Sequence, residues 1–409
     1  MQDRELYRQI LGIESPWKVE HVELRRADGE VHVFLEHNEQ ERWPCPECNV
    51  ECTLHDHQSE RRWRHLDTCQ YRTILHARPP RSDCPEHGPR VVRLPWAEPS
   101  SRFTALFEAL AISWLKPASQ QGVSELLALS WDEIHGILER AVQRGLARRG
   151  AEPIPHLGVD EKSFRKRHRY VTVVNDLNRS RVLFVAVGRR KASLDGFWET
   201  LSKEQLAAVE AVAMDMWDPY VASTREHLPE SDQKIVYDKY HIAAYLSKAV
   251  DQVRRAENKH LRTSGDKRLV GTKYAWLRHP ANFAEDAWRE FQTLRESDLK
   301  TARAWALKET AMHLFDYRRE SAARTFFELW RGWASRSRLT PMVAVARMLT
   351  ARLDNILTYL KHRVTNAVSE GLNSRIQWVK TTARGFRNQQ NFINAIYFHC
   401  GGLDMAPAH

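Results

Sequence analysis

Residues 366–380 read Asn-Ala-Val-Ser-Glu-Gly-Leu-Asn-Ser-Arg-Ile-Gln-Trp-Val-Lys, an expected helix in which Glu370 is the only carboxylate. This stretch decides the fold because its helix must pack where two distant aspartates lie. Far upstream, Asp160 and Asp215 each end an apolar, strand-like run. Hard divalent cations prefer oxygen ligands and keep positions open for phosphate oxygens and water. Three carboxylates from two strand ends and one helix therefore predict a site for a pair of such cations.

The apolar runs around the two aspartates predict a mixed β-sheet. Three β-rich runs come first, at residues 156–160, 170–176 and 181–187, and we expect them to pair antiparallel. Helices near 195–207 and 219–228 then alternate with strands at 209–215 and 234–238. This order predicts an RNase H-like mixed sheet flanked by helices, with both aspartates at its active edge.

A helical insertion is expected between this sheet and Glu370. The sequence is helix-rich from about residue 240 to 365, so the insertion must return the chain to the sheet. Tryptophans on the apolar stripes of such helices more often fill a core than contact nucleic acid; they are Trp276, Trp288, Trp305, Trp330 and Trp333.

The N-terminal region is β-rich and carries a predicted metal site. Apolar and polar residues alternate on both sides of Asp28-Gly29, which predicts a hairpin. Five of the six cysteines lie between positions 45 and 84, and this clustering suggests metal rather than disulfides. Two Cys-x-x-(Cys/His) turns joined by a β-rich stretch are typical of a zinc ribbon. We favour as its tetrahedral ligands Cys45, Cys48, Cys84 and His87.

Other residues compete for this metal site. The alternative ligands are Cys52, His55, His57 and Cys69, and the alternative to any metal is a set of free thiols in a reducing cytosol. Cys400 stands alone and is expected to be an ordinary buried thiol.

Amphipathic helices follow from Arg102 onward. Ser130 is an expected N-cap with Glu133 as its capping-box partner, and a short turn separates its helix from the one before. This pattern predicts a helix-turn-helix whose second helix would enter a DNA major groove, although any αα-hairpin shows the same pattern. The second helix supplies the basic residues Arg140, Arg144, Arg148 and Arg149.

The charge balance favours a polyanionic partner. Against 52 Asp and Glu stand 62 Lys and Arg, for a net charge of +10. Arginine runs beside aromatic residues suit phosphate contact and base stacking, although each run could equally be a solvated face; they lie at 61–64, 165–169, 189–191 and 384–387. No signal peptide or run of 18 apolar residues occurs, so we expect no membrane association and a bacterial, nucleoid-associated protein of the cytoplasm.

The three carboxylates suit phosphodiester hydrolysis and transfer. That chemistry needs a water or a 3′ hydroxyl activated on one metal and the leaving oxygen stabilised on a second. We assign Asp160 as the bridging ligand, Asp215 as the second and Glu370 as the third. We expect Glu161 to point to the opposite strand face, and Asp218 falls after its strand has ended. Any one of these carboxylates alone would more often have a surface or capping role.

The combined motifs give the chain a family resemblance: it is similar to the DDE transposases of bacterial insertion sequences, ISL-three group. The resemblance covers nearly the whole length and rests on the cysteine knuckles, the helix-turn-helix and four motifs: Gly158-Val-Asp-Glu161, Met214-Asp-Met-Trp217, Tyr237-Asp-Lys-Tyr-His-Ile242 and Ser369-Glu-Gly-Leu-Asn373. Family members commonly close the second knuckle with Cys-x-x-Cys, whereas this chain has His87 at the fourth ligand position, and zinc accepts that change.

The resemblance implies transposition. Terminal inverted repeats would be bound, strands cut at the element ends, and the freed 3′ hydroxyls joined to target DNA. The implied cofactors are two Mg²⁺ or Mn²⁺ ions per active site and one structural Zn²⁺, and the implied assembly is a homodimer on double-stranded DNA. Asp238 and His241 resemble a pair beside the catalytic carboxylates of related transposases, where His241 would hydrogen-bond the scissile phosphate; a capping or core histidine is the alternative.

Predicted DNA contacts complete the assignment. Besides Arg140, Arg144 and Arg148 they are Arg165, Lys166, Arg167, Asp238, Asn373, Arg375, Lys380, Arg384 and Arg387. The expected domains are a zinc-ribbon domain at 1–98, a helix-turn-helix at 99–152, the RNase H-like core at 153–240 and 363–409, and the helical insertion at 241–362. The fold class is multidomain α+β and α/β. A domesticated DNA-binding repressor and a structure-specific nuclease on the same fold are the competing functions.

Overall fold

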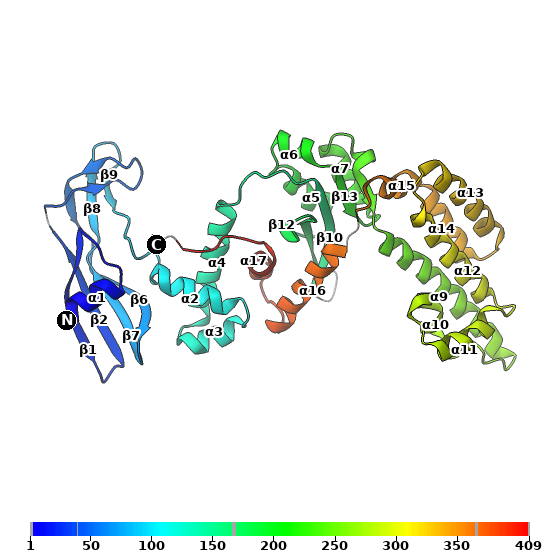
Figure 1. Ribbon diagram of the computed structural model, residues 1–409, viewed down its shortest axis with the longest axis horizontal. Coiled ribbons are helices and arrows are strands. Elements are labelled where there is room, and N and C mark those ends of the chain that lie inside the picture. The colour runs from blue at the N-terminus through cyan, green and yellow to red at the C-terminus, as the bar shows by residue number, and fades with distance from the viewer. Residues whose placement is uncertain (1–2, 39, 166–168, 365–366, 408–409) are drawn as a thin grey trace. The chain divides into compact units, whose positions relative to one another are not determined.

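The computed structural model describes residues 3–38, 40–165, 169–364 and 367–407. These residues form two compact units (Figure 1). Unit 1 contains residues 1–149, 382–384 and 403–409, and unit 2 contains residues 150–381 and 385–402. Within the described ranges, no helix combines the length and the apolar character needed to cross a membrane.

A four-stranded sheet forms the base of unit 1. Its order is β1-β2-β7-β6, built from β1 (Trp17–Arg25), β2 (Glu30–His37), β6 (Arg61–Thr68) and β7 (Tyr71–Ala77). The predicted hairpin joins β1 to β2, and Gly29 in its turn has a φ of 65°, which glycine adopts without strain. The apolar face of the sheet packs around Trp17, Trp63 and Trp96, together with Tyr7 of α1 (Asp3–Ile10).

Short strands beyond this sheet hold the two cysteine turns. β3 (Trp43–Pro44) pairs with β4 (Glu51–Cys52), and β8 pairs with both β5 and β9. The three strands of that second sheet are β5 (Leu54–His57), β8 (Pro80–Cys84) and β9 (Gly88–Val91). Each cysteine turn thus lies beside a strand that fixes its backbone.

Three helices follow in unit 1, namely α2 (Ala105–Leu115), α3 (Gln120–Leu127) and α4 (Trp131–Ala147). The predicted capping box begins α4: Ser130 accepts a hydrogen bond from the Glu133 amide, and the Glu133 side chain accepts one from the Ser130 amide. Residues 403–407, which we call the C-terminal tail, belong to the same unit and pack on α4. Leu403 of this tail faces Gly145.

The sheet of unit 2 has the predicted topology, with the order β12-β11-β10-β13-β14. β10 (His156–Arg165), β11 (Arg169–Asp176) and β12 (Arg181–Val187) pair antiparallel. β13 (Ala211–Met214) and β14 (Ile235–Tyr237) continue it in parallel. β10 is longer than predicted, because its antiparallel pairing with β11 continues past Asp160 to Arg165.

Helices cover both faces of this sheet (Figure 1). Leu157 and Val159 of β10 lie in one core with Phe197 of α5 and Tyr220 of α7, whereas Phe164 contacts Phe392 of α17 on the other face. α16, which bears Glu370, packs on this second face. The bounds of these helices are α5 (Lys191–Trp198), α6 (Lys203–Ala208), α7 (Asp218–His227), α8 (Ser231–Lys234), α16 (Ala367–Thr382) and α17 (Gln389–Cys400).

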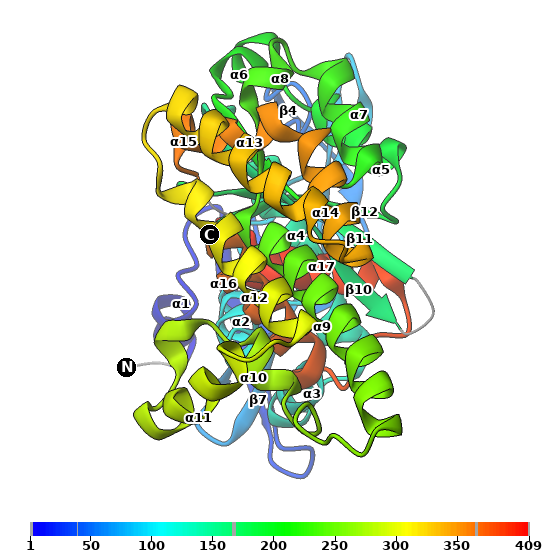
Figure 2. The ribbon, with the colours of Figure 1, turned by 90° about the vertical axis from the view of Figure 1, so that its right-hand side faces the viewer.

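The insertion is helical, as predicted. It begins with α9 (Lys239–Thr263), against which α12 and α14 pack (Figure 2). Trp276, Trp305 and Trp330 are buried in its core, as their position on apolar stripes indicated, while Trp333 is half-exposed. The other elements are α10 (Lys273–Leu277), α11 (Glu285–Arg295), α12 (Lys300–Met312), α13 (Glu320–Arg336), α14 (Thr340–Thr350), α15 (Leu353–His362) and 3₁₀ turns at Pro280–Asn282 and His313–Asp316.

Candidate active site and metal centre

Strand register places three aspartates at the same level of the sheet in unit 2. Gly158 of β10 lies opposite Ala213 of β13, so Asp160 and Asp215 each come two residues after that pair. Met214 lies opposite Tyr237 of β14, so Asp215 and Asp238 each come one residue after theirs. Because these three strands are parallel to one another, the aspartates gather at one edge.

α16 adds the remaining side chains from the face opposite α5 and α7. Asn373 donates a hydrogen bond from Nδ2 to Asp160 Oδ2 at 2.5 Å. Glu370 lies almost one turn before Asn373 and is therefore on the same side of the helix. Behind it, Asn175 of β11 donates to Ser369 Oγ at 3.1 Å, and both residues are fully buried. The predicted return of the chain to the sheet is thus made through polar contacts.

His241 and Asp238 stand at the start of α9. Asp238 caps this helix by accepting from the Tyr240 amide at 3.0 Å, and His241 Nδ1 lies 3.6 Å from Asp215 Oδ2. Burial raises the pKa of Asp238, and the nearby carboxylates of Glu370 and Asp160 raise it further, whereas His241 opposes the rise. The site therefore concentrates negative charge that a cation would offset.

The donor set fits hard divalent cations. Asp160, Asp215 and Glu370 offer carboxylate oxygens, the ligands that Mg²⁺ and Mn²⁺ prefer. In the part of the chain that the structure describes, the cysteine and histidine group is the one set of three or more such ligands whose atoms all lie within 4.8 Å of one another. The ligand atoms of the three carboxylates do not all lie within that distance of one another.

Neighbouring strand residues separate into two faces as predicted. Lys162, two residues after Asp160, lies on the same face, and its Nζ is 3.7 Å from Asp160 Oδ2. Glu161 points to the other face, where it pairs with Arg189 at 3.0 Å. Asp218 begins α7 and pairs with Arg352 at 2.8 Å, outside this cluster.

Of the predicted DNA contacts of the C-terminal region, Arg375 and Lys380 lie on α16, and Arg384 and Arg387 follow it in the sequence. Lys380 Nζ donates to the carbonyl of Ser163 at 2.8 Å, and Arg375 is exposed. Arg384 groups with unit 1 and Arg387 with unit 2, and both are exposed. Lys166 and Arg167 lie outside the described residues, and for Arg165 only the backbone, at the end of β10, is described.

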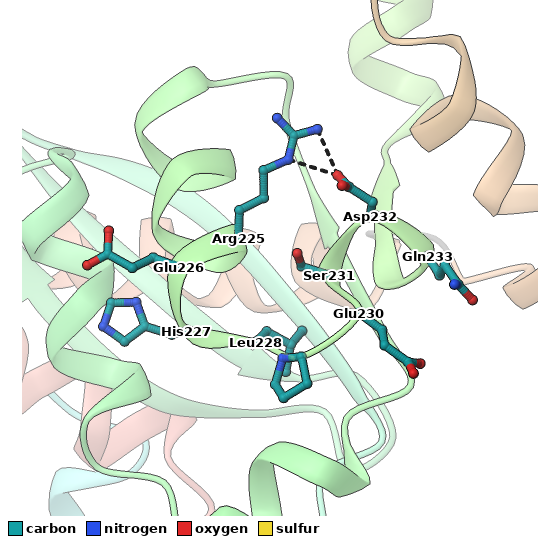
Figure 3. A pocket seen from close by; sticks show the side chains of 9 residues that line it. Arg225, Glu226, His227, Leu228, Glu230, Ser231, Asp232 and Gln233 are labelled. Carbon is teal, nitrogen blue, oxygen red and sulfur yellow. Dashed lines mark hydrogen bonds and ion pairs between the residues drawn. The ribbon is translucent and has the colours of Figure 1, made fainter.

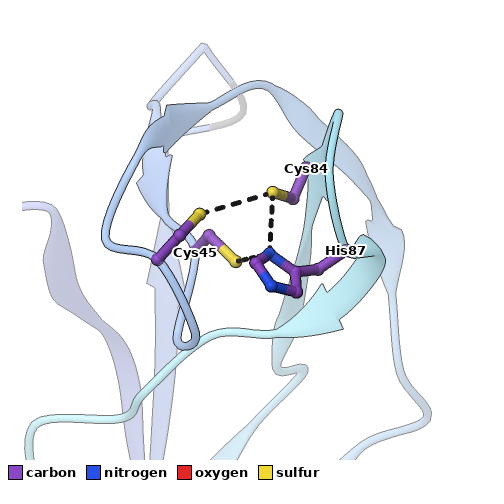
Figure 4. A group of neighbouring side chains, drawn as sticks. Cys45, Cys84 and His87 are labelled. Atoms are coloured by element: carbon purple, nitrogen blue, oxygen red, sulfur yellow. Dashed lines mark hydrogen bonds between the residues drawn. The ribbon is translucent and has the colours of Figure 1, made fainter.

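In unit 1, the structure brings together the four favoured metal ligands (Figure 4). Cys48 Sγ lies 3.6 Å from Cys84 Sγ, and His87 Nδ1 lies 3.6 Å from Cys84 Sγ and 3.9 Å from Cys45 Sγ. These spacings match the edges of a tetrahedron, about 3.7 Å for zinc–sulfur bonds of about 2.3 Å. The backbone N–H of His87 lowers the pKa of the Cys84 thiol to about 6, which favours the thiolate that a metal binds.

The competing ligands lie outside this group. Cys52 is buried nearby, but its thiol donates to the carbonyl of Val50 at 3.2 Å. Cys69 is exposed. His55 lies 3.8 Å from Asp83, and His57 contacts His37 at 2.9 Å. The four-residue cluster is therefore the arrangement that fits a tetrahedral metal.

The arginines of α4 have partners within unit 1. Arg144 is almost buried and donates to Glu98 at 2.6 Å and to Glu108 at 3.0 Å. Arg140 also binds Glu108, and Arg148 binds the carbonyl of Ala406 at 2.5 Å. Because Glu108 is only 1% exposed, these contacts neutralise a buried carboxylate, and they favour a structural role for Arg144 over the predicted DNA contact.

Sequence reasoning missed Asn175 as a site residue. Its signal was a polar residue within the apolar run of β11, and only the fold shows that it lies behind Glu370. A separate cavity of about 580 Å³ between α7 and α8 holds none of the predicted site residues (Figure 3). Its lining includes Arg225, which pairs with Asp232 at 2.8 Å.

Comparison with family models gives three matches along the chain. Residues 157–396 match the model of the DDE domain of the ISL3 type, described as a transposase. Residues 41–87 match a zinc finger of the transposases of IS204, IS1001, IS1096 and IS1165, and residues 92–142 match the helix-turn-helix domain of transposase family ISL3.

Two curated relatives and one solved structure are similar to the chain. The transposase of insertion sequence IS1557 from Mycobacterium tuberculosis is 27% identical over 96% of this chain and 94% of the relative. The transposase of IS1001 from Bordetella parapertussis is 27% identical over 85% of this chain and 86% of the relative. The Drosophila P element transposase strand transfer complex aligns with a TM-score of 0.42 and 12% identity, covering 76% of this chain and 94% of that chain.

Proposed function

Because the chain belongs to the ISL3 family of DDE transposases, we propose that it binds the terminal inverted repeats of its own insertion sequence, cuts the DNA at the element ends and joins the 3′ ends to target DNA. The observation that carries this proposal is the level register of Asp160 and Asp215, with α16 fixed to Asp160 through Asn373. Carboxylates from the sheet and from α16 could thus act on the same phosphodiester.

Each site residue has a proposed role. Asp160, Asp215 and Glu370 hold two Mg²⁺ or Mn²⁺ ions, which would activate the attacking oxygen and stabilise the leaving oxygen. Asn373 keeps Asp160 Oδ2 aimed at the edge of the sheet. His241, whose Nδ1 lies 3.6 Å from Asp215 Oδ2, would donate a hydrogen bond to the scissile phosphate. Asp238 caps α9 and thereby orients His241.

DNA binding is divided between two parts of the chain in this proposal. The helix-turn-helix and the Zn²⁺-bound ribbon read the terminal repeats, and the exposed Arg375, Arg384 and Arg387 grip phosphates near the cut. One Zn²⁺ per chain is held by Cys45, Cys48, Cys84 and His87. Two DNA ends require two active sites, so the assembly on DNA is a homodimer.

The experiment uses purified full chain, Mg²⁺ and a duplex carrying the terminal DNA that flanks its own gene. We expect Mg²⁺-dependent nicks at the repeat tip and strand-transfer products. Asp160→Asn, Asp215→Asn and Glu370→Gln should each abolish both products while DNA affinity stays within about twofold, because the ligand change removes metal rather than the phosphate grip.

The outcomes separate the competing functions. Retained cleavage in one variant would remove that residue from the triad. Tight binding of the repeat without cleavage would identify a repressor, and cleavage restricted to branched DNA would identify a structure-specific nuclease. Sedimentation of the complex with DNA should give two chains per pair of ends, and a monomer that cuts and joins would contradict the dimer.

A further inference from the structure

Arg189 contacts both segments that carry the catalytic aspartates. It lies between β12 and α5, and its Nη1 donates to Glu161 Oε1 at 3.0 Å and to Oε2 at 3.3 Å. Glu161 directly follows Asp160. The same guanidinium lies 4.7 Å from the ring centre of Trp217, which comes two residues after Asp215, and 4.4 Å from that of Tyr170 on β11.

Backbone hydrogen bonds carry these contacts to the aspartates themselves. The Glu161 N–H donates to Asp160 Oδ1 at 2.6 Å, and the Met216 N–H donates to Asp215 Oδ1 at 2.6 Å. The Trp217 indole N–H in turn donates to the carbonyl of Arg189 at 3.0 Å. The orientation of each carboxylate is thus set by the residue that follows it, and Arg189 holds both of those segments.

A guanidinium suits this position better than another cation would. Its planar group can stack on aromatic rings while its edge donates to a carboxylate, whereas a lysine ammonium is a point charge that does neither with the same geometry. Thr172 of β11 donates from Oγ1 to the carbonyl of Gly188 at 2.8 Å, and this bond holds the residue that precedes Arg189.

A direct DNA contact is the competing role for Arg189. The side chain is 34% exposed and lines an open cavity of about 820 Å³ together with Tyr170 and Trp217. A phosphate in this cavity could reach it. However, Nη1 of Arg189 already donates to Glu161, and its guanidinium lies over the rings of Tyr170 and Trp217. These contacts within the protein connect the segments that bear the three partners.

We propose that Arg189 is a positioning residue for the divalent cations: it ties Glu161 on β10 to the Trp217 turn after β13 and so fixes the separation and aim of Asp160 and Asp215. This inference rests on the proposed catalytic function, because it assigns Arg189 a role in that site alone.

The test measures the Mg²⁺ concentration that gives half-maximal nicking of the terminal duplex. Arg189→Lys keeps the charge but loses the planar group, and we expect that concentration to rise about tenfold, as for other residues that orient metal ligands. DNA affinity, measured in the same buffer with calcium replacing magnesium, should change less than twofold, and saturating magnesium should restore much of the nicking. Trp217→Phe, which loses the indole N–H but keeps a ring, should give a smaller rise.

The matched control is Arg225→Lys, which changes an ion-paired arginine of the same unit in the separate cavity of Figure 3. The control should match wild type in nicking and magnesium dependence, and an equal rise there would overturn the inference. So would an Arg189→Lys protein with wild-type magnesium dependence, or one that loses DNA affinity while its magnesium dependence stays unchanged. If the wild-type chain itself does not nick the duplex, the proposed function fails instead.

Discussion

At the scale of single residues, the position of Glu370 depends on a polar contact behind it. Asn175 and Ser369 are both fully buried, and their hydrogen bond at 3.1 Å joins β11 to the turn of α16 that bears Glu370. A buried polar group that loses its partner costs about 1–3 kcal/mol. This pair therefore helps to hold the Glu370 turn of α16 in place, together with the bonds that Asn373 and Lys380 make to β10.

We predict that Asn175→Leu, which has a similar volume, lowers the cleavage rate about tenfold or more, because Glu370 loses its fixed position. The apparent Kd for the terminal duplex should stay close to that of wild type. Rates are measured at saturating DNA. Asn178→Ala, at an exposed asparagine of the following turn, serves as the control and should cut normally. Full activity in Asn175→Leu would show that Ser369 needs no partner.

At the scale of elements, α4 contains two glycines that face different surroundings. A Cβ at Gly145 would lie 2.6 Å from Leu403 Cβ and 3.2 Å from the Asp404 carbonyl of the C-terminal tail. A Cβ at Gly136 would lie 3.4 Å from the movable end of Arg140. Of these two positions, only Gly145 lacks room for an added Cβ.

Alanine substitutions should therefore have opposite effects at the two positions. Gly145→Ala overpacks the contact with the tail and should destabilise unit 1 by about 1–3 kcal/mol. Gly136→Ala should stabilise α4 by about 0.5–1 kcal/mol, because alanine is the better helix former. Amide hydrogen exchange across α4 in the full chain measures both changes. Equal effects at the two positions would mean that the tail does not press on Gly145.

We predict that a bound zinc ion stabilises the two cysteine turns. Purified chain should contain about one zinc, and the Cys45→Ser Cys48→Ser double variant should contain none and should lose ordered structure in the ribbon. Metal analysis and hydrogen exchange of residues 43–91 give the two readings. The matched variant is Cys69→Ser, at an exposed cysteine outside the cluster, and it should keep its zinc. A metal-free ribbon that is still folded would contradict the assignment.

At the scale of the whole molecule, the net charge of +10 should appear as a strong salt dependence of DNA binding. The slope of log K against log salt is about −0.9 for each phosphate neutralised. Arg375→Gln removes an exposed charge of α16 and should reduce the slope by about one. The control is Arg331→Gln, whose arginine is paired with Glu328 on the insertion and should leave the slope unchanged. An unchanged slope in Arg375→Gln would remove that residue from the DNA contacts.

Much of this architecture could be predicted from the sequence, because local patterns carry it. Apolar runs predicted three antiparallel strands followed by two further strands, Ser130 and Glu133 marked the start of α4, and the helical stripes marked the insertion. The spacing of the cysteines likewise gave the cluster of four ligands.

What the sequence could not give are contacts between distant segments. Glu108 and Arg144 each look like surface charges, but they form a buried pair that only the packing of α2 on α4 creates. In the same way, nothing local to Arg189 indicates that its partners are Glu161, Tyr170 and Trp217. The basic run at 189–191 suggested a solvated face or a DNA contact, and the structure shows that Arg189 is bound to partners within the protein.

The contact between α4 and the C-terminal tail also sets an order of events during synthesis. Arg144 and the Met405 carbonyl that it binds at 2.6 Å are 261 residues apart along the chain. A ribosome needs roughly 13 to 52 seconds to add that many residues at its usual pace. The helix expected to read DNA therefore lacks this contact until residue 405 has been translated. A chain that stops before residue 403 should have an α4 without the contacts of the tail, and we expect its affinity for the terminal duplex to be lower.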